Sequence, residues 1–110
     1  MTIVNMKYED GVVFVSGISH ATGSPETCNG ISSLFYALEG YLANNEIKVK
    51  NHVSDLRPGY AFIEFEPLSS ELVPILQMFY IGISQIVNTY DEKFAKIRVD
   101  DTFLDFISGE

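Results

Sequence analysis

Residues 3–18 read IVNMKYEDGVVFVSGI, and this stretch decides the fold. Its two halves, 3–8 and 12–18, are rich in the β-branched and aromatic residues that favour strands. Asp10-Gly11 stands between them, and an Asp-Gly pair between two apolar runs is a strong signal for a tight β-hairpin. We therefore expect the chain to open with two antiparallel strands.

A helix is expected to follow this hairpin. Ser24-Pro25-Glu26 offers an N-cap oxygen, a proline at the first helical position and an acid in the first turn. Apolar residues then recur at helical spacing as far as Asn44-Asn45. The later elements are expected as strands over 47–53, 60–65 and 95–99, and as a second helix that runs from Ser69 or Ser70 to Tyr90 with Pro74 in its first turn.

The stretch 47–53 alternates in the way a half-buried strand does, with Ile47, Val49, Asn51 and Val53 at every second position. A turn at Arg57-Pro58-Gly59 joins it to the next strand, which predicts a second hairpin. The resulting order is ββαββαβ. The sequence thus predicts a single α+β domain with a mostly antiparallel sheet and two helices packed on one face of it.

The composition excludes several classes of protein. Of the 110 residues, 46% are hydrophobic and 20% are charged, which argues against disorder. Cys28 is the single cysteine, so a disulfide scaffold is excluded. Fifteen acids against seven bases give a net charge of −8. That balance disfavours direct nucleic-acid binding, which needs basic patches, and suits a basic partner.

The location expected from the sequence is the cytoplasm, because the N-terminus shows no export signal. Residues 72–90 carry no charge over about the length of a bilayer span. Polar residues interrupt this stretch and no basic cluster flanks it, so a helix packed in the core and at a subunit contact is expected instead of a membrane span. Residues 100–110 form an acidic tail whose apolar positions fit a short docked helix.

Cys28 is the residue best suited by type and position to take part in catalysis. It falls in the first turns of the first predicted helix, where unpaired N–H groups and the macrodipole favour a thiolate. His20 lies eight residues earlier in the connecting loop, within reach of a Cys–His pair for nucleophilic catalysis. The alternative is a small buried cysteine and a solvated histidine, and residue types alone leave both open.

The segment SGISHA at residues 16–21, followed after a short loop by CNGISSL at 28–34, resembles the Prp family of ribosomal-processing cysteine proteases. The family pattern is Gly-His-Ala, a glycine-containing loop, and a cysteine with serine four and leucine six residues later. His20-Ala21, Cys28, Ser32 and Leu34 match it in order, and the likeness spans the chain to about Val99. Ser19 and the shortened, proline-containing loop depart from the pattern. They indicate either a divergent or phage-encoded member or a member that has lost activity.

The resemblance implies a protease domain over residues 1–99 that acts as a homodimer. Its substrate would be a protein: the N-terminal extension of a basic ribosomal protein or, in phage relatives, a capsid or scaffold protein. In the mechanism so implied, Cys28 attacks the scissile carbonyl and His20 takes its proton. The backbone N–H groups of Cys28 and Asn29 would hold the oxyanion, and Glu26, Ser24 or Ser32 would orient His20.

No cofactor and no metal are expected. Two histidines and one cysteine lack the paired spacing of a structural zinc site, and His52, on a predicted strand, is expected to be a surface or hairpin residue. Two further functions stay open beside the protease. One is a non-catalytic dimeric interaction module on the same fold, and the other is a phage assembly accessory protein with a structural cysteine.

Overall fold

The computed structural model describes residues 2–19, 25–89 and 95–108, and of residues 19 and 25–28 it describes the backbone only. Five strands, two long helices, a short C-terminal helix and a single 3-10 turn follow one another along this part of the chain. In order they are β1 (Thr2–Glu9), β2 (Val12–Ser19), α1 (Pro25–Ala43), η1 (Glu46–Lys48), β3 (Val49–Arg57), β4 (Tyr60–Pro67), α2 (Leu72–Thr89), β5 (Ala95–Val99) and α3 (Asp101–Ile107). The predicted ββαββαβ order and the α+β class are confirmed.

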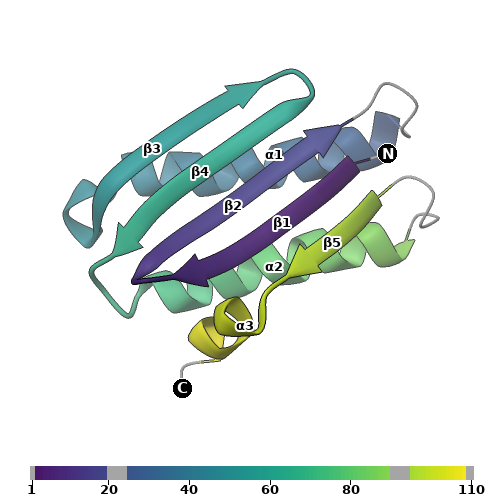
Figure 1. Ribbon diagram of the computed structural model, residues 1–110. Helices are drawn as coiled ribbons and strands as arrows, with labels where there is room; N and C mark the ends of the chain where they lie inside the picture. The colour runs from purple at the N-terminus through teal and green to yellow at the C-terminus, as the bar shows by residue number, and fades with distance from the viewer. Residues whose placement is uncertain (1, 20–24, 90–94, 109–110) are drawn as a thin grey trace.

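The strands form a single sheet in the order β3-β4-β2-β1-β5 (Figure 1). All neighbouring pairs are antiparallel except β1 and β5, which run parallel. Helix α2 crosses over from the end of β4 to the start of β5, so β5 has the direction of β4, which is also the direction of β1. Asp10 and Gly11 close the first hairpin with φ of 53° and 80°. Positive φ at both central residues is the geometry that the Asp-Gly pair favours, and it matches the twist of the strands.

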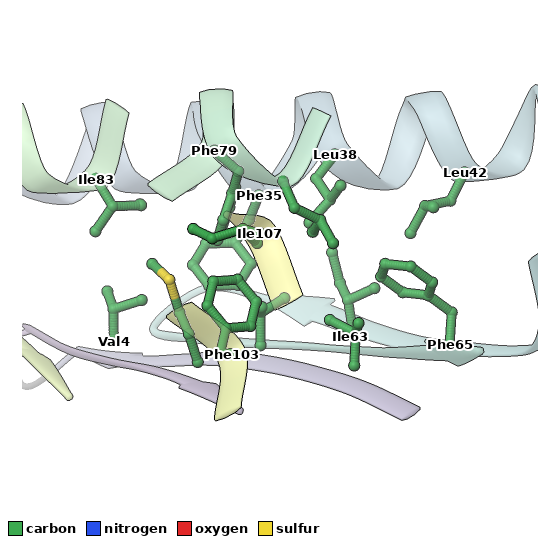
Figure 2. Close-up of a cluster of buried hydrophobic side chains, with 14 of the residues drawn as sticks. Val4, Phe35, Leu38, Leu42, Ile63, Phe65, Phe79, Ile83, Phe103 and Ile107 are labelled. Atoms are coloured by element: carbon green, nitrogen blue, oxygen red, sulfur yellow. The ribbon is translucent and has the colours of Figure 1, made fainter. Parts of the chain in front are cut away.

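One face of the sheet is covered by α1 and α2, and no described element covers the other (Figure 1). Alternation along the strands sets this arrangement: Val4 and Met6 of β1 and Val13 and Val15 of β2 are buried toward the helices. Figure 2 shows this core between the sheet and the helices. The rings of Phe35 and Phe79 meet edge to face there, with their centroids 5.1 Å apart.

The two long helices approach each other closely where glycines remove side-chain bulk. A Cβ at Gly30 would lie 2.9 Å from Ile86 Cδ1, and one at Gly82 would lie 2.9 Å from Leu34 Cδ1. Each glycine weakens its helix by about 1 kcal/mol relative to alanine. At Gly30 and Gly82 this loss of helix stability is offset by the close packing of α1 against α2, which a larger side chain would prevent.

The prediction for residues 47–53 is wrong in its details. Ile47 lies in η1 with 90% of its surface exposed, and β3 begins only at Val49. The register against β4 then shifts between Lys50 and Val53, where Asn51 takes a φ of 55°. A bulge of this kind inserts one extra residue and so reverses which side chains face the helices. Val53 is therefore exposed on the open face rather than buried with Val49.

Helix α2 begins at Leu72, two or three residues later than predicted, after a turn in which the N–H groups of Leu72 and Val73 donate to the carbonyls of Ser69 and Ser70. Pro74 is the third residue of the helix, as its lack of an N–H requires. By length and composition alone α2 could cross a membrane. In the structure it buries Leu72, Leu76, Phe79 and Ile83 against the core.

Helix α3 packs against β1 and α2 at the end of the sheet farthest from the first turn of α1 (Figure 1). Phe103 and Ile107 are buried, and Phe106 stacks on Tyr8 with ring centroids 4.2 Å apart. The Gln77 side-chain amide donates to the carbonyl of Ile107. The apolar positions of the acidic C-terminal segment therefore extend the main core.

Candidate active site

The first turn of α1 lies at the end of the sheet where β2 finishes and where the turn between β3 and β4 is found (Figure 1). The helix begins at Pro25, as the Ser24-Pro25-Glu26 signature predicts, and Cys28 is its fourth residue. His20 and Ser24 lie outside the described residues, as do the side chains of Glu26 and Cys28. The pairing of Cys28 with His20 and the orienting roles of Glu26 and Ser24 therefore stay predictions.

Asn29 and Ser32, the other two candidate residues, are both exposed on α1. The carbonyl oxygen of Asn29 accepts a hydrogen bond of 2.8 Å from the hydroxyl of Ser33. In a helix that begins at Pro25, the N–H of Asn29 pairs with the carbonyl of Pro25. The N–H groups of Glu26 and Thr27 then remain as first-turn donors without a partner inside the helix.

A cavity of about 90 Å³ opens beside this part of α1. Its described walls come from α1, from Thr2 of β1, from β2 and from the β3–β4 hairpin, so residues far apart in the sequence enclose it. Ile31, Ser32 and Phe35 contribute one wall, and Leu56, Tyr60 and Ala61 contribute the opposite one. Ser32 follows Cys28 by four residues, which is one helical turn, so the cavity begins one turn from the cysteine along α1.

Two close contacts shape the cavity. Gly17 of β2 is buried beneath Phe35, and a Cβ at Gly17 would lie 3.1 Å from Phe35 Cε2. On the other side Arg57 pairs with Asp55 at 3.1 Å, and its guanidinium lies 4.9 Å from the centroid of the Tyr60 ring. The sequence analysis identifies Arg57-Pro58-Gly59 as a turn, but it does not reveal that Arg57 and Gly59 line a cavity together with residues of α1.

A second polar cluster lies farther along α1. The half-buried Glu39 carboxylate is hydrogen-bonded to His52 Nε2, 2.9 Å from its Oε2, and accepts a hydrogen bond from the Ser54 hydroxyl, 2.9 Å from its Oε1. His52 lies in the β3–β4 hairpin, one of the two positions that the sequence predicts, and its side chain contacts α1. The bulge in β3 turns it toward the helix, and strand periodicity does not reveal that bulge. Among the described residues no group of three or more potential ligands for a metal ion was found.

No protein-family model and no curated protein matches this sequence. Solved structures do match. The chain is similar to the essential ribosomal processing protease Prp from S. aureus crystallised with a covalently linked product peptide, with a TM-score of 0.67 and 18% identity over 91% of this chain and 100% of that one. The same protease with a substrate peptide gives a TM-score of 0.64 at 15% identity over the same shares of the two chains.

A protein from Streptococcus mutans is similar as well, with a TM-score of 0.65 and 16% identity over 90% of this chain and 96% of that one. In each case the match covers nearly the whole of both chains, so it concerns the complete arrangement of sheet and helices. These similarities support the resemblance to the Prp family that the motif around His20 and Cys28 indicates. The chain has the fold of the Prp ribosomal processing proteases.

Proposed function

We propose that the protein is a small cysteine endopeptidase with Cys28 as nucleophile and His20 as general base. The observation that carries this proposal is the position of Cys28 in α1, one turn before the cavity at Ser32, in a fold shared with a protease crystallised with a covalently linked product peptide. A cysteine near a helix N-terminus has its thiolate favoured by the first-turn N–H groups and the macrodipole.

In the proposed reaction the Cys28 thiolate attacks the carbonyl carbon of the scissile peptide bond, and His20 holds the proton taken from the thiol. The tetrahedral intermediate collapses as His20 gives that proton to the departing amine, which leaves an acyl-enzyme. Water, deprotonated by His20, then hydrolyses the thioester and regenerates Cys28. The N–H groups of the first turn of α1, around Cys28, are the proposed donors to the oxyanion.

The proposed substrate is a ribosomal protein of the large subunit that carries a short N-terminal extension, with a phage capsid or scaffold protein as the alternative. A protein of net charge −8 complements a basic ribosomal segment and raises the rate of encounter with it. The test is incubation of such a precursor with the protein and mass analysis of the products. A new N-terminus close to the start of the mature protein is expected.

We also propose that the protein works in the cytoplasm as a homodimer through the outer side of the helix pair. Met78 and Ile81 of α2 are 73% and 53% exposed, and an apolar groove of about 230 Å³ runs between α1 and α2 beside Met78. Exposed apolar surface of this kind marks protein contacts. Sedimentation at micromolar concentration is expected to show a species of twice 12.3 kDa, and a monomer alone would argue against the dimer.

A further inference from the structure

We propose that the outer edge of β5 binds an extended segment of a partner protein, in which carboxylates alternate with aliphatic residues, as one further strand of the sheet. The edge and the groove beside it share no described residue with the cavity near Cys28. The partner also differs in charge from the proposed substrate, which is basic. The inference therefore goes beyond the proposed function.

Strand β5 ends the sheet, with β1 on one side and no described strand on the other (Figure 1). Just after β5 the N–H of Asp100 donates to the carbonyl of Met6 on β1. The backbone groups of a strand point alternately to its two sides, so the N–H and C=O groups of Ile97 and Val99 point away from β1. Such a row of backbone groups is a template for one more strand.

The opposite edge of the sheet is less suited to this pairing. The register of β3 against β4 shifts between Lys50 and Val53, and Asn51 takes a φ of 55°. A bulge of this kind bends an edge strand and hinders the addition of another strand. In contrast, β5 pairs with β1 from Ala95 to Val99 without a shift, so its outer edge is regular along the whole strand.

A groove of about 660 Å³ lies along β5, between this strand, α2 and α3. Its wall on α2 is a stripe of residues at helical spacing, which consists of Tyr80, Ser84, Val87 and Asn88. Leu104 of α3 adds another apolar side chain. Every second side chain of an added strand points toward the helices and would pack against this wall. The groove therefore selects aliphatic residues at those positions.

The remaining side chains of the added strand would lie beside Lys96 and Arg98. Alternation places these two bases on the open face of the sheet, in register with Ile3 and Asn5 of β1, and both are exposed. The ion pairs of the described residues involve other basic side chains, those of Lys7, Lys48, His52 and Arg57. Opposite charges on neighbouring strands stabilise a sheet, so carboxylates at every second position complement this edge.

A second copy of the chain is a poorer occupant of the same edge. Antiparallel pairing of β5 with its counterpart in another copy would bring Lys96 and Arg98 against the same two bases, and like charges directly opposite each other are destabilising. The charge of this edge therefore favours a different protein, one that supplies the acids.

The test measures binding of synthetic peptides to the whole protein. Acetylated and amidated hexapeptides are titrated into the isotope-labelled chain, and amide shifts are followed by NMR. The first peptide alternates glutamate with valine, the second alternates lysine with valine, and the last has all its glutamates before all its valines. The first is expected to bind at least about tenfold more tightly than either of the others, with the largest shifts at Ile97 and Val99.

Matched variants locate the site. Arg98→Glu is expected to weaken binding of the glutamate–valine peptide by about tenfold and to strengthen binding of the lysine–valine peptide. Lys50→Glu is the control, because Lys50 is exposed on the opposite edge strand and the change in net charge is the same. Ile97→Pro removes an N–H that points away from β1, and it is expected to weaken binding at least about tenfold while the hydrogen bonds between β1 and β5 remain.

Equal affinity for the two alternating peptides, shifts confined to other parts of the chain, or an Arg98→Glu protein that binds as the wild type does would each overturn the inference. Absence of binding by every peptide would overturn it as well, because Lys96 and Arg98 would then serve only to prevent aggregation at the sheet edge. A dimer that Ile97→Pro converts to a monomer in sedimentation would assign the edge to a second copy instead.

Discussion

Replacing Cys28 with alanine is expected to lower cleavage of the ribosomal precursor by at least about a thousandfold. Without the thiolate no acyl-enzyme forms, and the remaining groups only bind and polarise the peptide. The measurement is the rate at which the new N-terminus appears in mass spectra. Cys28 is the one cysteine of the chain, so no second thiol substitutes for it.

The control for this substitution is Ser33→Ala. Ser33 is exposed on α1, close to Cys28 in the sequence, and its hydroxyl bonds only to the carbonyl of Asn29 in the described structure. Cleavage by the Ser33→Ala protein is expected to match that of the wild type. A C28A protein that cleaves at the normal rate would contradict the protease mechanism. Retained partner binding and an unchanged cellular phenotype in that variant would identify an interaction module instead.

Phe103→Ala is expected to lower the free energy of unfolding by about 3–5 kcal/mol, the cost of removing a fully buried aromatic side chain. Phe103 of α3 is 0% exposed and belongs to the same core as Met6 and Leu76. Its loss leaves a void in the core beneath α3. Urea unfolding of the wild type and the variant gives the difference directly.

The neighbouring exposed residue supplies the control for α3. Thr102→Ala changes a side chain of the same helix without touching the core, so a change within about 0.5 kcal/mol is expected. If Phe103→Ala has an equally small effect, α3 contributes nothing to the core in solution. The C-terminal segment would then be an appendage of the folded domain rather than part of it.

Local signals are sufficient to predict most of the fold. The Asp10-Gly11 pair closes the hairpin because both residues accept positive φ, and Pro25 starts α1 because a first-turn proline loses no hydrogen bond. The same reasoning fails for the stretch 47–53. A bulge at Asn51 depends on how β3 pairs with β4, so the strand's own alternation does not reveal which side Val53 takes.

The candidate site likewise has a part that the sequence predicts and a part that depends on the assembled fold. The motif around His20 and Cys28 is local, and its resemblance to the Prp family predicts a nucleophile near a helix start. The cavity beside it is not local, since Gly17, Ile31 and Tyr60 meet only when β2, α1 and β4 are assembled. The contact of His52 with Glu39 likewise depends on the bulge, so the sequence predicts a surface or hairpin position for that histidine and does not reveal its partner on α1.

The most direct test of the proposed Cys28–His20 pair is the pH dependence of Cys28 alkylation in the wild-type, His20→Ala and His52→Ala proteins. An activated cysteine is expected to react with an apparent pKa well below the ordinary value of about 8.5. That pKa should rise when His20 is removed and stay unchanged when His52, which bonds to Glu39, is removed. A thiol with an ordinary pKa that neither substitution alters would contradict the account.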